Sequence, residues 1–293
     1  MSPIPQTHLK SVVVDDGIKV FYREAGSESK PAFLLLHGFP SSSFQYRNLI
    51  PLLADKYHVF APDLPGFGFT EVPEDRNYSY TFDSLTKTVG AFIDAVGIKK
   101  FIVYVFDYGA PTGFRLMLQR PDQVIAVVSQ NGNAYVEGLG DFWNTVKAYW
   151  EDPSPQNKAP LESLTGFDTT KFQYVTGAPN PESIAPETYH LDYHLMTRPG
   201  NADIQLGLLY DYRNNVTLYP AFQEYFRTHK LPILAVWGKN DPFFIPPGAE
   251  AFNRDSPNVN VKFVDAGHFA LESHVQEIAN EIIDFLDKSK LEL

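Results

Sequence analysis

The chain contains no cysteine among its 293 residues. This absence excludes disulfide frameworks, thiolate metal sites and thiol nucleophiles. Basic residues are also scarce, since 24 Lys and Arg stand against 35 Asp and Glu and give a formal charge of −11. The negative charge disfavours nucleic acids and anionic membrane surfaces as partners. We therefore expect a small-molecule substrate, neutral or cationic, as the main partner.

Long apolar runs are missing as well. No segment approaches the roughly 20 consecutive apolar residues that span a bilayer. The N-terminal sequence MSPIPQTH has neither the basic nor the apolar region of a secretory leader. We therefore expect no membrane partner and a cytoplasmic location, while a homodimer stays open.

The first part of the chain alternates between strand and helix patterns. A hairpin is predicted over residues 9–24, where two β-branched runs flank Asp15-Asp16-Gly17. Short, continuously apolar segments, which are typical of strands buried on both faces, occupy 32–36, 57–62, 101–105 and 124–129. Apolar residues at helical spacing occupy 44–53, 82–96 and 112–119. This alternation predicts an α/β fold with a mostly parallel central sheet flanked by helices.

The alternation stops near residue 130 and resumes about a hundred residues later. Residues 134–219 are rich in Asn, Pro, Tyr and Trp, with helical patches and no strand pattern. Strands at 233–238 and 259–264 and an amphipathic helix at 275–286 follow. We therefore predict a core formed by residues 1–133 and 220–293, with a helical cap inserted at 134–219.

Three polar residues follow predicted strands of the core. Asp107, Asp241 and His268 come after the strands at 101–105, 233–238 and 259–264. Ligand sites in open α/β sheets lie along the edge formed by the carboxyl ends of the strands. Each residue alone has a structural explanation: a helix N-cap, a turn before proline and a core histidine, respectively. Their order, nucleophile then acid then histidine, favours a catalytic triad with Asp in the usual place of Ser.

Two further motifs accompany this triad. They are His37-Gly38-Phe39-Pro40 and Asp63-Leu64-Pro65-Gly66-Phe67-Gly68, each directly after a predicted strand. With the triad, they resemble the epoxide hydrolase and haloalkane dehalogenase branch of the α/β-hydrolase superfamily over nearly the whole chain. The resemblance implies the α/β-hydrolase fold with an inserted cap and Asp107 as nucleophile. It also implies an oxyanion hole formed by the backbone N–H groups of Phe39 and Tyr108.

An aspartate nucleophile restricts the chemistry. A carboxylate attacks saturated carbon that bears a leaving group, whereas its attack on a carboxylic ester would give a mixed anhydride. The alkyl ester is then hydrolysed by water that His268 deprotonates, while Asp241 orients and stabilises the imidazole. This route needs only protein and water, so we expect no cofactor and no metal. His190 and His194 have the spacing of a metal pair on a helix, but no third ligand is evident.

The departing group separates the candidate activities, because an alkoxide needs acidic donors. Epoxide hydrolases of this family use two cap tyrosines, and the resemblance implies Tyr212 and, less closely, Tyr149 in these roles. With 16 tyrosines in the chain, ordinary packing is the alternative for both. The other expected substrate-binding residues are His37, Phe106, Trp150 and Phe269.

Some positions depart from both subfamilies. Related dehalogenases usually have Trp after the nucleophile and often Asn in the oxyanion segment, where this chain has Tyr108 and Phe39. Epoxide hydrolases usually have Gly-His before the nucleophile and Trp after it, where this chain has Val105-Phe106 and Tyr108. Halo-acid dehalogenases carry Arg after the Asp. We expect an epoxide hydrolase acting on a small apolar epoxide, with a haloalkane or halo-acid dehalogenase and a non-catalytic binder as alternatives.

Overall fold

The computed structural model describes residues 5–289 and 291 of the chain. Its centre is an eight-stranded sheet in the order β1-β2-β4-β3-β5-β6-β7-β8. The hairpin of β1 (His8–Val14) and β2 (Ile18–Ala25) joins β4 (His58–Pro62) in antiparallel fashion. The remaining pairs are parallel and involve β3 (Ala32–Leu36), β5 (Phe101–Phe106), β6 (Val124–Gln130), β7 (Ile233–Gly238) and β8 (Val259–Val264). The predicted mostly parallel sheet is therefore confirmed.

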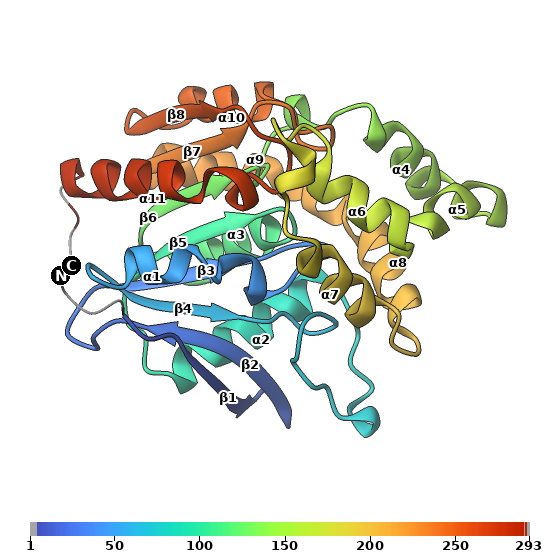
Figure 1. Ribbon diagram of the computed structural model, residues 1–293, viewed down its shortest axis with the longest axis horizontal. Coiled ribbons are helices and arrows are strands. Elements are labelled where there is room, and N and C mark those ends of the chain that lie inside the picture. Colours follow the sequence, from blue (N-terminus) through green and yellow to red (C-terminus); the bar gives the residue numbers. More distant parts are fainter. Residues whose placement is uncertain (1–4, 290, 292–293) are drawn as a thin grey trace.

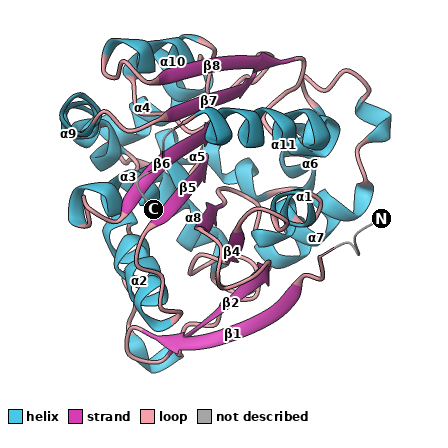
Figure 2. Cartoon of the chain, turned by 90° about the vertical axis from the view of Figure 1, so that its left-hand side faces the viewer, coloured by secondary structure: helices cyan, strands magenta, loops and turns pink. Residues whose placement is uncertain are grey.

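Helices cover both faces of the sheet, as Figure 2 shows. Because side chains alternate along a strand, successive residues of β5 enter two separate apolar cores. One core lies under α2 (Phe82–Ala95), α3 (Gly109–Gln119), α9 (Arg213–His229) and α10 (Pro247–Ala251). The other lies under α1 (Leu49–Leu53) and α11 (Leu271–Lys288). None of the described helices is long and apolar enough to cross a membrane.

Five successive helices after β6 lie beyond the carboxyl ends of the strands (Figure 1). They are α4 (Phe142–Glu151), α5 (Pro155–Glu162), α6 (Phe167–Val175), α7 (Pro186–Met196) and α8 (Asn201–Asp211). The next helix, α9, returns to the core, where the rings of Phe222 and Phe226 each lie 5.5 Å from that of Phe114. Helix α9 therefore crosses the boundary that we predicted at residue 219.

The helices predicted at 44–53 and 275–286 differ most from the structure in their limits. The segment 44–53 is divided into a 3-10 turn, Ser43–Tyr46, and the short helix α1. Pro51 has no N–H for a helical bond to an earlier carbonyl, so it is tolerated only in the first turn of a helix. Helix α11 begins four residues before the predicted Val275, but the backbone at His274 is non-helical (φ −128°, ψ 26°). The regular part of α11 thus starts where the periodicity placed it.

Candidate active site

Asp107 occupies a tight turn between β5 and α3. Its φ is 46°, a region that residues other than glycine seldom adopt. Two glycines let neighbouring backbone approach this turn closely. A Cβ at Gly109 would lie 2.1 Å from the carbonyl oxygen of Leu36, and a Cβ at Gly38 would lie 2.3 Å from Asp107 Oδ1. The strained turn therefore places the Asp107 carboxylate at the carboxyl edge of the sheet.

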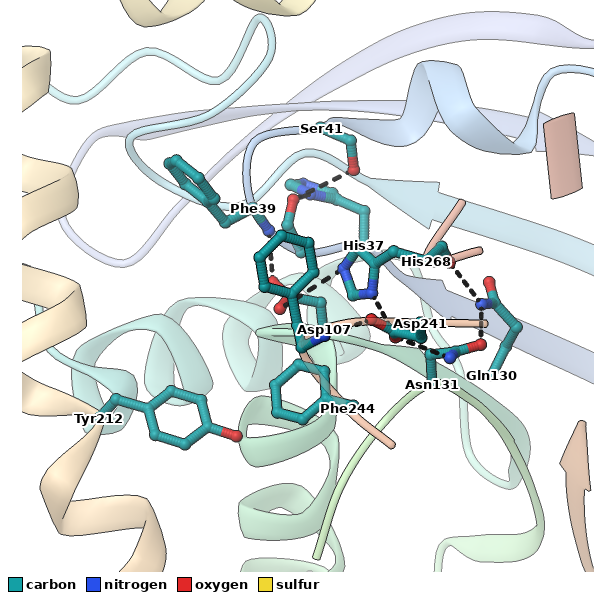
Figure 3. A network of polar contacts seen from close by, with 12 residues as sticks. His37, Phe39, Ser41, Asp107, Gln130, Asn131, Tyr212, Asp241, Phe244 and His268 are labelled. Atoms are coloured by element: carbon teal, nitrogen blue, oxygen red, sulfur yellow. Dashed lines mark hydrogen bonds and ion pairs between the residues drawn. The ribbon is translucent and has the colours of Figure 1, made fainter. Parts of the chain in front are cut away.

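The two oxygens of Asp107 have different surroundings. The Phe39 N–H donates a hydrogen bond to Oδ1 at 2.6 Å, and the Tyr108 N–H also hydrogen bonds to this carboxylate. Oδ2 faces the imidazole of His268, with 3.8 Å between Oδ2 and Nε2. Oδ1 is thus held by a backbone donor, while Oδ2 points toward the histidine (Figure 3).

Asp241 holds His268 from the opposite side. Its Oδ2 lies 2.7 Å from His268 Nδ1, and its Oδ1 accepts a hydrogen bond from the Phe243 N–H at 2.7 Å. A carboxylate only accepts, so Nδ1 carries the proton and Nε2 is left to face Asp107. The structure thus brings together the three residues that the sequence analysis selected as a triad.

Asn131, just past the end of β6, is a further member of this network. Its Nδ2 donates to Asp241 Oδ2 at 2.7 Å, and its Oδ1 accepts from the Gly238 N–H at 2.9 Å. The neighbouring Gln130 donates from Nε2 to the His268 carbonyl at 3.0 Å. Neither residue is predicted from the sequence, although amides at the end of the strand between β5 and β7 lie at the edge where ligand sites form. Asn131 orients the carboxylate that in turn orients the histidine.

Burial shifts the protonation equilibria of the pair in the cavity floor. Desolvation raises the pKa of Asp107 to about 6, against the opposing effects of His268 and the two backbone donors. Burial disfavours the charged form of His268 too, but the charge and hydrogen bond of Asp241, with the charge of Asp107, outweigh it and raise the His268 pKa. The Asp107 carboxylate therefore stabilises protonated His268.

A small cavity lies between this floor and the cap. Its titratable lining residues are Asp107, His268 and Tyr108, and its other aromatic lining residues are Phe39, Phe142, Trp143, Phe243 and Phe244. The space open to the centres of water molecules is about 40 Å³, against the roughly 10–15 Å³ that one water requires. The cavity therefore suits an apolar molecule of a few heavy atoms.

The two predicted cap tyrosines are not among the residues that line this cavity. The Tyr212 hydroxyl lies 3.3 Å from that of Tyr219, and the Tyr212 ring packs 4.5 Å from Trp143. Tyr149 packs against the ring of Tyr210 at 5.1 Å. In Figure 3, Tyr212 stands apart from the network around Asp107. The placement of both side chains fits the packing alternative better than a role at the substrate.

The four other predicted substrate-binding residues also lie behind the cavity wall, contrary to expectation. His37 Nε2 accepts a hydrogen bond from the Leu64 N–H at 3.0 Å, and its Nδ1 lies 3.2 Å from the Gly38 carbonyl oxygen in the oxyanion segment. Phe106 packs 4.6 Å from the His268 ring. Phe269 stacks on a cap tyrosine, and Trp150 Nε1 donates to the Leu209 carbonyl at 2.8 Å. These side chains support the site from behind.

Within the described ranges, no group of three His, Asp or Glu side chains could hold a metal ion. His190 lies 4.8 Å from the ring of Phe167, in an aromatic packing contact on α7. The arrangement at the sheet edge is instead suited to nucleophilic attack by Asp107 Oδ2, followed by water activation at His268 Nε2.

Comparisons with known proteins agree with this arrangement. A family model described as alpha/beta hydrolase fold matches residues 31–275. The chain therefore belongs to the α/β-hydrolase family, and it is a hydrolase related to epoxide hydrolases and haloalkane dehalogenases.

Particular relatives cover nearly the whole chain. It is 51% identical over 276 residues to the uncharacterized hydrolase YNR064C of Saccharomyces cerevisiae, covering 93% of this chain and 94% of that one. It is 34% identical over 281 residues to haloalkane dehalogenase 2 of Mycobacterium bovis, covering 91% of each. The solved structure of the epoxide hydrolase CorEH has a TM-score of 0.76 at 20% identity, covering 96% of this chain and 99% of that one. This last likeness is one of fold.

Proposed function

We propose that this chain hydrolyses small epoxides to diols through a covalent ester on Asp107. The observation that carries the proposal is that the two oxygens of the Asp107 carboxylate have different partners. The Phe39 N–H holds Oδ1 at 2.6 Å, while Oδ2 lies 3.8 Å from His268 Nε2 at the cavity floor. This geometry supports a nucleophile that keeps its own oxyanion hole throughout the reaction.

The first step transfers a carbon of the epoxide to the enzyme. Oδ2 of Asp107 attacks that carbon, the carbon–oxygen bond of the ring breaks, and the bonding electrons stay on the departing oxygen. That oxygen accepts a proton and becomes a hydroxyl group. The product of this step is a hydroxyalkyl ester in which Oδ1 is the carbonyl oxygen, still held by the Phe39 N–H.

The second step releases the diol. His268 Nε2 takes a proton from water, and the water oxygen attacks the ester carbon of Asp107. Negative charge then develops on Oδ1, where the backbone N–H groups of the oxyanion hole stabilise it. The bond between the ester carbon and Oδ2 then breaks, and Oδ2 leaves with the diol after accepting the proton held by His268. The remaining carboxyl group of Asp107 loses the second proton of the attacking water, which restores the proton given up in the first step. Ester formation also removes the Asp107 charge that raises the pKa of His268. The histidine is thus more readily neutral, and able to act as a base, in the step that needs a base.

The source of the proton in the first step favours an epoxide over a halide. Tyr108 lines the cavity, and no hydrogen bond joins its hydroxyl to another residue in the part of the chain that the structure describes. Burial and the charge of Asp107 raise the pKa of this hydroxyl, and the Asp107 charge is lost as the ester forms. A phenol can give a proton to an alkoxide, whereas a halide needs none. The lining indole, Trp143, donates its Nε1–H to the Phe243 carbonyl at 3.0 Å and is therefore occupied. We assign the donor role to Tyr108 in place of the cap tyrosines.

A haloalkane dehalogenase remains the second candidate because of the 34% identity to haloalkane dehalogenase 2. Both reactions displace a leaving group from saturated carbon and give the same kind of ester. They differ in what departs, so the choice depends on the substrate that forms the ester.

A single-turnover experiment in ¹⁸O-labelled water tests the covalent route. Enzyme in excess over 1,2-epoxybutane should give a diol whose new oxygen is unlabelled, because that oxygen comes from Asp107. The Asp107 peptide should gain one ¹⁸O, as measured by mass spectrometry after digestion. Label in the diol instead, with none in Asp107, would show direct attack by water and refute the ester. The same experiment with 1-bromobutane tests the dehalogenase alternative.

Replacing Tyr108 by Phe should lower the rate of ester formation from an epoxide by about 100-fold, since a general acid contributes at least that factor. The ring, which packs 5.1 Å from Phe82, is retained. Rapid-quench kinetics measure the rate. The matched variant Tyr212→Phe, which removes a hydroxyl paired with Tyr219, should react within about threefold of wild type. The reverse pattern would return the donor role to Tyr212.

A further inference from the structure

Two buried side-chain amides of the cap each have one polar atom at the cavity without a hydrogen-bond partner. Six buried side-chain atoms of the described residues have no partner, and two of them, Gln173 Nε2 and Gln205 Oε1, belong to residues that line the cavity. Gln173 is on α6 and Gln205 on α8, the helices that lie over the carboxyl ends of the strands (Figure 1). Both side chains are more than nine-tenths buried.

The orientation of the Gln205 amide is fixed by one contact with the core. Its Nε2 donates to the carbonyl oxygen of Gly66 at 3.1 Å. A carbonyl oxygen only accepts, so the opposite amide atom must be Oε1, which is left as an acceptor. This contact joins the cap to the loop after β4 and gives Nε2 a hydrogen-bond partner. It leaves Oε1 without a function, and a buried acceptor without a donor is costly to maintain.

Gln173 is less constrained than Gln205. No hydrogen bond joins its amide to another side chain or backbone group within residues 5–289. An amide carries both donors and acceptors, so Gln173 can serve either kind of partner. The roof of the cavity therefore offers an acceptor at Gln205 and an adaptable polar group at Gln173, in otherwise apolar and aromatic surroundings.

We infer that these two amides select a substrate with a neutral hydrogen-bond donor beside its reacting carbon, of which a hydroxyl is the simplest. The inference rests on the proposed function and narrows its substrate to small hydroxylated epoxides. A hydroxyl donates to Gln205 Oε1 and can also accept a hydrogen bond from an amide N–H.

Charged groups fit this roof poorly. No Lys or Arg is among the lining residues, and the Asp107 carboxylate of the floor would repel a substrate carboxylate. Desolvating an ammonium group among the aromatic residues would be unfavourable as well. The small size of the cavity further restricts the hydroxyl to a short arm on the epoxide.

A substrate pair of nearly equal shape provides the test. In 2,3-epoxypropan-1-ol, the ring carries CH₂OH, and in 1,2-epoxybutane it carries CH₂CH₃. Wild-type enzyme should have a kcat/KM about tenfold higher for the alcohol, which corresponds to about 1.4 kcal/mol. A site that hydrogen bonds to a hydroxyl leaves its own polar atoms unpaired when the analogue lacks that group.

Replacing Gln205 with Met keeps the length of the side chain and removes the acceptor. The kcat/KM ratio of alcohol to alkane should fall about tenfold, and Gln173→Met should lower the same ratio. The matched control is Gln223→Met, because Gln223 Nε2 also donates to a backbone carbonyl, that of Ala134 at 2.9 Å, away from the cavity. The control should retain the wild-type ratio. Both substrates meet the same enzyme sample, so the ratio does not depend on the fraction that is folded.

The outcomes separate this inference from the proposed function. If wild type turns over both epoxides with a kcat/KM ratio near one, the inference is overturned and the proposed function stands. The same holds if the ratio is unchanged in both Gln variants. Failure to turn over either epoxide overturns the proposed epoxide hydrolysis. The pair 3-bromopropan-1-ol and 1-bromobutane then tests the amide roof on the dehalogenase alternative, with the same tenfold expectation.

Discussion

Replacing Asp107 with Asn should abolish hydrolysis while making the folded protein more stable at neutral pH. The amide is not a nucleophile toward an epoxide carbon, so kcat/KM should fall by about 10⁴ or more. Asn is the suitable replacement because it tolerates a positive φ better than most residues, and Asp107 has a φ of 46°. Its Oδ1 can still accept from the Phe39 N–H. The change thus removes the charge and keeps the shape.

The gain in stability follows from the raised pKa of Asp107, which burial shifts from 3.8 to about 6. A carboxyl whose pKa is raised on folding destabilises the folded state wherever it is ionised. This destabilisation is fully present above pH 6 and disappears as the pH falls below 3.8, the value expected in the unfolded chain. At about 1.4 kcal/mol per pH unit, the free energy of unfolding of the Asn variant should exceed that of wild type by about 2–3 kcal/mol at pH 8.

Urea denaturation at pH 8 and pH 4 measures this difference, and it should shrink at the lower pH. Asp287 on α11 supplies the control, because it is a half-exposed carboxylate paired with Lys56. Asp287→Asn should change neither activity nor, beyond about 0.5 kcal/mol, stability. An Asp107→Asn protein that hydrolyses epoxides at the wild-type rate would refute the nucleophile. If the Asn variant were less stable than wild type at pH 8, the buried, ionised carboxylate would not destabilise the folded state.

The core of the fold could be predicted from sequence because its signals are local. Strands β3, β7 and β8 coincide with the predicted segments. The first two are short apolar runs that are buried on both faces, whereas β8, at the edge of the sheet, alternates apolar residues with Asn260 and Lys262. The proximity of Asp107, Asp241 and His268 is also predictable, because parallel strands end at the same edge of the sheet. The order of the motifs therefore predicts that residues far apart in the chain meet in one site.

The cap could not be predicted at the same level. Which face of α8 meets the cavity depends on how the cap rests on the core, and helical patches with weak amphipathicity do not encode that contact. The motif around Tyr212 predicts a role at the substrate, but its ring packs against Trp143 and its hydroxyl pairs with that of Tyr219. Gln205 looks like an ordinary surface position in sequence, and only the packing of the cap on the core brings it to the lining of the cavity.

Replacing His268 with Gln should trap the ester that wild-type enzyme hydrolyses. The side chain of Gln cannot act as a general base, so hydrolysis of the ester should slow by about 10² to 10⁴-fold. Attack by Asp107 needs no base, and the Phe39 N–H still holds Oδ1. The ester should therefore accumulate to nearly one equivalent, which intact-protein mass spectrometry detects. An adduct with the full mass of 1,2-epoxybutane identifies ring opening, whereas an alkyl adduct from 1-bromobutane, without bromine, identifies halide displacement.

The pH dependence of trapping distinguishes a carboxylate nucleophile from other sites of modification. Asp107 must be ionised to attack, so the rate of adduct formation should rise with pH. The charge of His268 lowers the pKa of Asp107, and the variant lacks that charge. The rise should therefore occur at a higher pH in the variant than the value of about 6 that applies to the wild-type protein. His190→Gln, on the cap helix α7, is the matched control and should show no adduct at steady state. An adduct in His268→Gln that maps away from Asp107, or none with any epoxide or bromoalkane, would contradict the ester route, because the variant removes only the base that the second step requires.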